Sequence, residues 1–273
     1  MRKTLTKLSS NFLLLMVAAV QLFPLYWMLT FSLKDNKEIF GGNTLGLPQV
    51  WQWDNYTSVL SQSRIGFYLL NSLIITALTI MFTVFLSAMA TYAIVRLKWM
   101  MSKIVYFIFL IGLMLSMHAV LLPLFVNLKP LHNTYWSLVL PYTAFAMPMA
   151  ILVMVGSLEG LPKEMEEAAF IDGAGIYMIF FRIILPLLRP IMATVAILTF
   201  LNSWNEMMLA VTFVSNDNYK TITVGVLDMV GKYSTKWGLI GAGLVVATIP
   251  TLLVYIFLSN NVQKSFTAGA VKG

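Results

Sequence analysis

The stretch that decides the fold reads LPKEMEEAAFIDGAG, residues 161–175, and it is a charged link between two long apolar runs. The run before it covers roughly residues 135–158, and the run after it covers roughly residues 183–213. A helix needs about 20 mostly apolar residues to cross a bilayer, and both runs reach that length. The sequence therefore predicts two membrane spans joined by a polar loop over residues 159–182.

Further apolar runs extend this pattern along the rest of the chain. They cover roughly residues 12–33, 68–95, 104–126 and 239–258. Together the runs predict an all-α, polytopic membrane protein with about six transmembrane helices and a short cytoplasmic helix. No long polar stretch remains to build a separate soluble domain, so we expect a single membrane domain over residues 1–273.

The composition agrees with a membrane protein and excludes several other classes. Of the 273 residues, 59% are hydrophobic and 11% are charged, whereas soluble domains carry roughly 45–50% apolar and about 25% charged residues. Cysteine is absent, which excludes disulfides, thiol catalysis and cysteine-based metal sites. The two histidines, His118 and His132, are too few for a histidine-rich metal site. We therefore expect neither a metal nor a cofactor.

The basic residues indicate the orientation of the chain. They lie in short clusters between apolar runs, so the net charge of +7 does not form one patch for nucleic acid. Arg96, Lys98 and Lys103 occupy the tight link between the second and third runs, whereas the link over residues 127–134 holds one lysine. Short cytoplasmic loops carry an excess of lysine and arginine. This bias places both termini and the loop over residues 159–182 in the cytoplasm.

The loop over residues 159–182 carries the signals of a short helix. Pro162 suits the first turn of a helix, because its missing N–H would have no intrahelical partner there. Glu164, Glu166 and Glu167 follow, where the helix dipole favours negative charge. Gly173 suits a C-terminal stop. These residues predict a helix of about ten residues that ends in a glycine turn.

One face of this predicted helix carries two alanines, which make a shallow surface. Met165, Ala168, Ala169 and Asp172 are spaced by three and four residues and share one side. Two alanines would let a partner protein approach the helix closely, so the face suits docking in a groove. The alternative is a helix that lies on the membrane surface, which normally has large apolar residues opposite lysine and arginine.

The same loop resembles the EAA loop of ABC importer permeases. The likeness covers Glu167-Ala168-Ala169-Phe170-Ile171-Asp172-Gly173-Ala174, then Phe180, Ile183, Leu185-Pro186 and Pro190. In that family the loop forms a coupling helix, which sits in a cleft of a cytoplasmic ATPase. The resemblance implies that the chain couples to an ATPase through Glu167, Ala168, Ala169, Asp172 and Gly173.

Other motifs resemble the carbohydrate-uptake branch, and most of all its maltose-type second permease. They are Asn202-Ser203-Trp204-Asn205-Glu206, Thr223-Val224-Gly225 and the C-terminal stretch over residues 267–273. The resemblance implies import of a sugar across a bacterial or archaeal inner membrane. It also implies a second permease as a heterodimer partner, two ATP-binding subunits and an extracytoplasmic sugar-binding protein. A permease for a polyamine or phosphate remains the alternative.

Asn202, Asn205 and Glu206 form a candidate translocation path within the fifth apolar run. A charged side chain in a span costs roughly 2.5–3.5 kcal/mol on insertion scales, so Glu206 should face protein or water. The alternative role of Glu206 is a structural hydrogen bond to the partner permease. His118, inside the third run, is expected to be a packing residue.

The chain shows no sequence motif for ATP binding. Gly231-Lys232 is its one Gly-Lys pair, and Tyr233 follows instead of serine or threonine. We therefore expect the chain itself not to be an enzyme, with ATP hydrolysed by a partner ATPase. Two other classes remain as rivals, a membrane-embedded enzyme and a proton-coupled carrier that acts alone.

Overall fold

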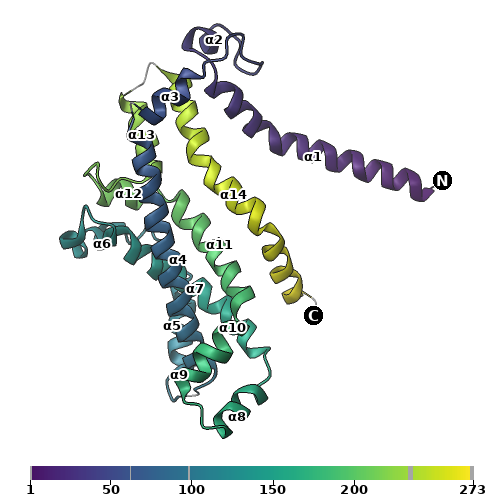
Figure 1. Ribbon diagram of the computed structural model, residues 1–273, viewed down its shortest axis with the longest axis vertical. Helices are drawn as coiled ribbons and strands as arrows, with labels where there is room; N and C mark the ends of the chain where they lie inside the picture. Colours follow the sequence, from purple (N-terminus) through teal and green to yellow (C-terminus); the bar gives the residue numbers. More distant parts are fainter. Residues whose placement is uncertain (1, 62, 98, 233–235, 271–273) are drawn as a thin grey trace. The chain divides into compact units, whose positions relative to one another are not determined.

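The computed structural model describes residues 2–61, 63–97, 99–232 and 236–270, and within these ranges the regular structure is helical, without strands (Figure 1). The all-α prediction is therefore confirmed. The chain divides into two compact units. Unit 1 combines Met1–Phe67 with Gly225–Pro250, and unit 2 combines Tyr68–Val224 with Thr251–Gly273. The single membrane domain over residues 1–273 remains a prediction.

Four helices of the described residues are long and apolar enough to cross a membrane. They are α1 (Arg2–Ser32), α4 (Ile65–Val95), α7 (Trp136–Glu159) and α14 (Trp237–Ala270). They correspond to the first, second, fourth and sixth predicted runs. A bent pair, Ile176–Leu187 with Arg189–Asn205, raises the number to five if the pair counts as one span. The number of six spans remains a prediction.

The third predicted run, residues 104–126, does not form one continuous helix. It is divided into α5 (Ser102–Gly112) and α6 (Leu121–Asn127). After Gly112 the backbone N–H groups donate to carbonyls three residues earlier instead of four. Leu113 donates to Leu110, and Leu115 donates to Gly112. A Cβ on Gly112 would lie 3.0 Å from Pro148 of α7. The close packing needs glycine, and glycine is a poor helix former, so the helix ends there.

The fifth predicted run, residues 183–213, is also interrupted. The segment consists of α9 (Ile176–Ile179), the π-helix η2 (Phe180–Ile184), α10 (Leu185–Leu187), α11 (Arg189–Asn205) and α12 (Met208–Phe213). A bend of 72° separates Leu187 from Arg189. Pro190 has no N–H for the helical ladder and its ring clashes with the carbonyl four residues earlier, which explains a bend at this point. A second break follows at Glu206, whose backbone is extended.

Helix α7 is the packing partner shared by several helices of unit 2, since it contacts α5, α11 and α12. A buried cluster joins its C-terminal half to α4 and to the segment after α8 (Glu164–Ile171). Its members include Tyr92, Met154, Leu158, Phe180 and Ile184. Helices in a bilayer associate by close packing rather than by a hydrophobic driving force. Ala169 of α8 packs against this cluster, and α8 lies at one end of unit 2 (Figure 1).

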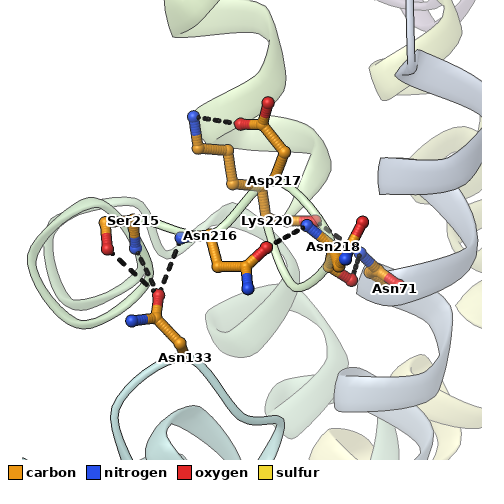
Figure 2. Close-up of polar contacts among 7 residues, drawn as sticks. All are labelled: Asn71, Asn133, Ser215, Asn216, Asp217, Asn218 and Lys220. Atoms are coloured by element: carbon orange, nitrogen blue, oxygen red, sulfur yellow. Dashed lines mark hydrogen bonds and ion pairs between the residues drawn. The ribbon is translucent and has the colours of Figure 1, made fainter.

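Side-chain amides fix a loop at the other end of unit 2, between α12 and α13 (Ile222–Lys232). Figure 2 shows Asn133 Oδ1 accepting the backbone N–H groups of Ser215 at 2.8 Å and Asn216 at 2.7 Å. Asn71 Nδ2 donates to the carbonyl oxygens of Asn218 and Lys220 at 3.1 and 3.0 Å. Two asparagines from distant parts of the sequence therefore hold the loop over residues 214–221.

Unit 1 contains α1, the short helices α2 (Asn36–Phe40) and α3 (Asp54–Ser61), and the start of α14. A Cβ on Gly238 would clash with the carbonyl oxygen of Lys34. One on Gly241 would lie 2.8 Å from the ring of Phe31. Glycine thus lets α14 approach the end of α1 closely, as small residues do between membrane helices.

Candidate functional site

The loop over residues 159–182 contains α8, which begins at Glu164 and ends at Ile171. The expected helix of about ten residues is therefore eight residues long, and Pro162 lies before the helix rather than in its first turn. The carbonyl of Lys163 starts the ladder by accepting the N–H groups of Glu166 and Glu167 at 2.9 and 3.0 Å. The helix begins with its first acid because carboxylates are favoured at the positive end of the helix dipole.

The predicted glycine stop of α8 is confirmed. Gly173 has φ of +82°, a conformation that glycine adopts without strain. The N–H of Ala174 bonds to the carbonyl of Ala169 at 2.9 Å, and the N–H of Gly173 bonds to the carbonyl of Phe170 at 3.1 Å. This pair of bonds is a Schellman motif, which satisfies carbonyls at the end of a helix.

Most of the residues predicted to couple to an ATPase are exposed on α8. Glu167, Ala168, Asp172 and Gly173 face the surface, whereas Ala169 is half-buried and packs against the cluster around Tyr92 and Leu158. Of the two alanines on the predicted face, Ala168 is therefore exposed for a partner, whereas Ala169 packs inside unit 2.

Large apolar side chains near α8 were not included in the predicted coupling set. Phe170 is 68% exposed, Ile171 is 85% exposed and Tyr177 of α9 is 79% exposed. Large exposed apolar groups that gather at one place indicate a contact surface. The sequence carried this signal, since all three lie in a charged loop between two apolar runs.

Sequence reasoning assigned Arg96 only to the charge bias of the cytoplasmic loops. In the structure its Nε lies 2.6 Å from Oε1 of Glu166 on α8. Its Nη2 donates to the carbonyl oxygens of Leu158 and Leu161, at 3.0 and 2.9 Å. The 70-residue separation between Arg96 and Glu166 left no local pattern that could have revealed this contact.

A cavity of about 310 Å³ lies among α4, α7, α11 and the segment between α5 and α6. It is lined by Thr79, Leu115, Met117, His118, Tyr142, Phe145, Ala146, Thr199, Asn202, Ser203 and Glu206. Asn202 and Glu206 of the candidate path therefore share one cavity. Asn205 is not part of its lining; its Nδ2 donates to the carbonyl of Leu201 at 2.8 Å. His118, expected to be a packing residue, is part of the lining.

The carboxyl group of Glu206 is held by groups of its own chain. Tyr142 OH donates to Oε2 at 2.7 Å. The backbone N–H of Leu209 donates to Oε1 at 2.9 Å, and that of Ala210 donates to Oε2 at 3.3 Å. Glu206 thus satisfies N–H groups in the first turn of α12, which have no intrahelical partner. Glu206 therefore makes structural hydrogen bonds, as its alternative role predicted. The partners of these bonds belong to this chain, whereas the prediction placed them on the second permease.

The family model for the inner membrane component of binding-protein-dependent transport systems matches residues 84–268. The chain belongs to this family. The match contains α8, Glu206 and part of α14. The chain is therefore a multi-pass membrane permease of an ABC importer that works with a binding protein. Permeases of this family are not enzymes, because separate subunits hydrolyse ATP.

Two relatives of this permease match along nearly their whole length. One is the probable ABC transporter permease YurM of Bacillus subtilis (strain 168), with 36% identity over 96% of this chain and 87% of the relative. The other is the diacetylchitobiose uptake system permease NgcG of Streptomyces coelicolor, with 32% identity over 96% of this chain and 88% of the relative. These matches confirm the resemblance to sugar-importer permeases.

A solved structure confirms the fold of the permease. It is a crystal structure of a bacterial ABC transporter involved in the import of the acidic polysaccharide alginate, with a TM-score of 0.82 and 19% identity. The likeness covers 94% of this chain and 96% of that chain. At this identity the likeness shows the fold alone. The roles of single residues in α8 and in the cavity remain predictions.

Proposed function

We propose that this permease is one of two membrane subunits in an ATP-driven importer for a sugar or oligosaccharide. A binding protein on the outer side of the membrane delivers the sugar, and two ATP-binding subunits drive transport from the cytoplasm. The name of the Streptomyces coelicolor relative, a diacetylchitobiose uptake permease, supports a carbohydrate as the substrate. The motif Asn202-Ser203-Trp204-Asn205-Glu206 supports the same substrate class.

The observation that carries the proposal is the exposure of α8 at one end of unit 2. Its Schellman turn gives the helix a defined end, and Glu167, Ala168 and Asp172 are free to meet another protein. The exposed side chains of Phe170 and Ile171 add apolar area to this contact. In the proposed complex α8 docks in a groove of the ATPase, with Glu167, Ala168, Ala169, Asp172 and Gly173 as the coupling residues.

The proposed orientation follows from this docking. The ATPase binds nucleotide in the cytoplasm, so α8 lies on the cytoplasmic side and both termini lie on that side as well. The second permease subunit completes the path, because importers of this kind alternate between conformations of two packed bundles.

The cavity around Glu206 is the proposed part of the path within this subunit. Asn202, Glu206 and His118 offer polar atoms for sugar hydroxyls, and Tyr142 and Phe145 offer aromatic surface. Sites for small molecules combine such apolar walls with a few polar groups. Asn205 is exposed beside this cavity and remains a candidate for the path on that ground.

Transport by the assembled importer in proteoliposomes tests the proposed function. Labelled diacetylchitobiose and maltose are the probes, with spermidine and phosphate as the non-sugar comparison. Sugar uptake that requires ATP and the binding protein is the expected result. Uptake of spermidine or phosphate alone would favour the non-sugar alternative. Uptake by the permease without its ATPase would instead identify a carrier that acts alone.

A further inference from the structure

A single arginine side chain joins three segments at the cytoplasmic end of unit 2. Arg96 directly follows α4, which ends at Val95. Its Nε pairs with Glu166 in the first turn of α8, at 2.6 Å, and its Nη2 donates to the carbonyls of Leu158 and Leu161. Leu158 belongs to the last turn of α7. The guanidinium therefore links the end of α4, the end of α7 and the coupling helix.

The ion pair between Arg96 and Glu166 is buried, unlike a charge that only sets the orientation of the chain in the membrane. The side chain of Arg96 is 5% exposed and that of Glu166 is 13% exposed. A charge that only fixes membrane orientation can stay in water, as Lys103 does in the same link. A guanidinium presents five N–H donors in a planar fork and can serve several acceptors at once, which a lysine cannot do with the same geometry.

Among the three acids of α8, Glu166 is the one whose side chain is largely covered by the rest of unit 2. Glu164 and Glu167 on the same helix are exposed. An eight-residue helix is too short to be stable on its own in water, so its position depends on contacts with its surroundings. Ala169 and Ala174 supply apolar contacts with the buried cluster. The ion pair between Arg96 and Glu166 adds an electrostatic contact between the first turn of α8 and the end of α4.

We propose that Arg96 is a positioning residue for the coupling helix, acting through Glu166. It holds α8 in the orientation that an ATPase meets, and it transmits a displacement of α8 to α4 and α7. The covalent chain connects α8 to α7 through residues 160–163 and to α9, but it gives α8 no direct link to α4. The inference rests on the proposed function, since it assumes that an ATPase moves α8.

The first test measures the position of α8 and requires no transported sugar. The chain contains no cysteine, so two introduced cysteines can be spin-labelled without background. Glu164→Cys on α8 and Met149→Cys on α7 are exposed positions for the pair. In the assembled importer, Arg96→Gln is expected to broaden the distance distribution between the two labels. Lys103→Gln, which removes a positive charge from the same link, is expected to leave it unchanged.

The second test measures coupling in proteoliposomes as sugar uptake per ATP hydrolysed. Arg96→Gln and Glu166→Gln are each expected to lower this ratio by a factor of about 5 or more, the lower end of typical coupling between sites. The double variant is expected to be no worse than either single one, because partners in one contact are not additive. Glu164→Gln removes an exposed acid from the same helix and is expected to keep the wild-type ratio.

Specific outcomes would overturn the proposal. An unchanged distance distribution and an unchanged coupling ratio in Glu166→Gln would do so, even where Arg96→Gln fails to insert. A lower melting temperature with normal coupling would show that the pair only stabilises the fold. A wild-type importer that takes up no sugar would contradict the proposed function, whereas the spin-label comparison would still test the position of α8.

Discussion

Glu206 shows how a carboxyl group is accommodated at the end of an apolar helix. It accepts hydrogen bonds from Tyr142 OH, from Leu209 N–H and from Ala210 N–H. A buried polar group that keeps such partners avoids most of the penalty of leaving water. The same bonds allow the chain to leave one helix at Asn205 and start another at Met208. Glu206 is therefore a structural element of the cavity as well as a candidate contact for a substrate.

The hydrogen bond from Tyr142 to Glu206 gives a prediction at the residue scale. Tyr142→Phe removes the donor and leaves a carboxyl oxygen without one of its partners, which should lower the free energy of unfolding by about 1–3 kcal/mol. Thermal unfolding of the purified permease in detergent measures the change. Tyr255→Phe, which alters a 66% exposed tyrosine, serves as the control and should have little effect. Equal stability of both variants would contradict the structural role of this bond.

Helix α8 is the element whose shape was most accessible from sequence. Its acidic start and its glycine stop are local signals, because both depend on residues within one or two turns. The turn is confirmed in the structure by φ of +82° at Gly173. The length of the helix was less accessible, since Pro162 suits either the first turn or the residue before the cap.

The coupling helix gives a prediction at the scale of the element. Glu167→Lys reverses an exposed charge, and Gly173→Pro forces φ near −65°, far from the observed value. Both variants should still insert in the membrane, but ATP hydrolysis should become uncoupled from sugar uptake. The ratio of the two rates in proteoliposomes measures the effect.

Gly175 offers a matched control for the glycine variant. Its φ is −73°, and a Cβ there would meet no atom within 4 Å. Gly175→Ala should therefore retain normal coupling. Wild-type coupling in both Glu167→Lys and Gly173→Pro would show that α8 does not meet the ATPase through these residues.

The loop over residues 214–221 gives a second prediction at this scale (Figure 2). Asn133 has φ of +60°, and its side chain accepts two backbone N–H groups of the loop. Asn133→Gly keeps the backbone free of strain but removes these hydrogen bonds. The free energy of unfolding should therefore fall by about 1–3 kcal/mol. Asn133→Ala should cost a further 1–2 kcal/mol or so, because alanine is strained at positive φ.

Limited proteolysis of the loop, together with thermal unfolding, compares the two asparagine variants. The alanine variant should be cut faster than the glycine variant, and both should be cut faster than the wild type. A loop with unchanged resistance in Asn133→Gly would mean that the amide of Asn133 does not hold it.

At the scale of the whole molecule, the arrangement of polar segments predicts which side of the membrane each one faces. Met165→Cys on α8 should react with a membrane-impermeant maleimide only from the cytoplasmic side. Asn216→Cys in the loop over residues 214–221 should react only from the outer side. The absence of natural cysteine makes each signal unambiguous, and labelling in intact cells and in inverted vesicles measures it. Reaction of both positions from the same side would contradict the proposed orientation.

The sequence by itself determined the class of the protein and predicted its coupling loop. Apolar runs of spanning length become helices because a bilayer offers no other partners for backbone N–H and C=O groups. That reason predicted the helices α1, α4, α7 and α14, whose apolar residues are contiguous. The pattern from Glu167 to Gly173 predicted the coupling loop for a different reason, because it depends on neighbouring residues alone.

Tertiary structure decided where α5 and α11 end and which distant residues meet, whereas Pro190 marks the bend before α11 in the sequence itself. Helix α5 ends where Gly112 packs closely against Pro148. Helix α12 begins after Glu206, whose carboxyl group accepts a hydrogen bond from Tyr142. Arg96 and Glu166 meet although 70 positions separate them, and His118 joins Glu206 in one cavity. Contacts of this kind depend on how packed helices align in three dimensions. Hydrophobic length specifies that a segment spans the bilayer, but only packing specifies its partners.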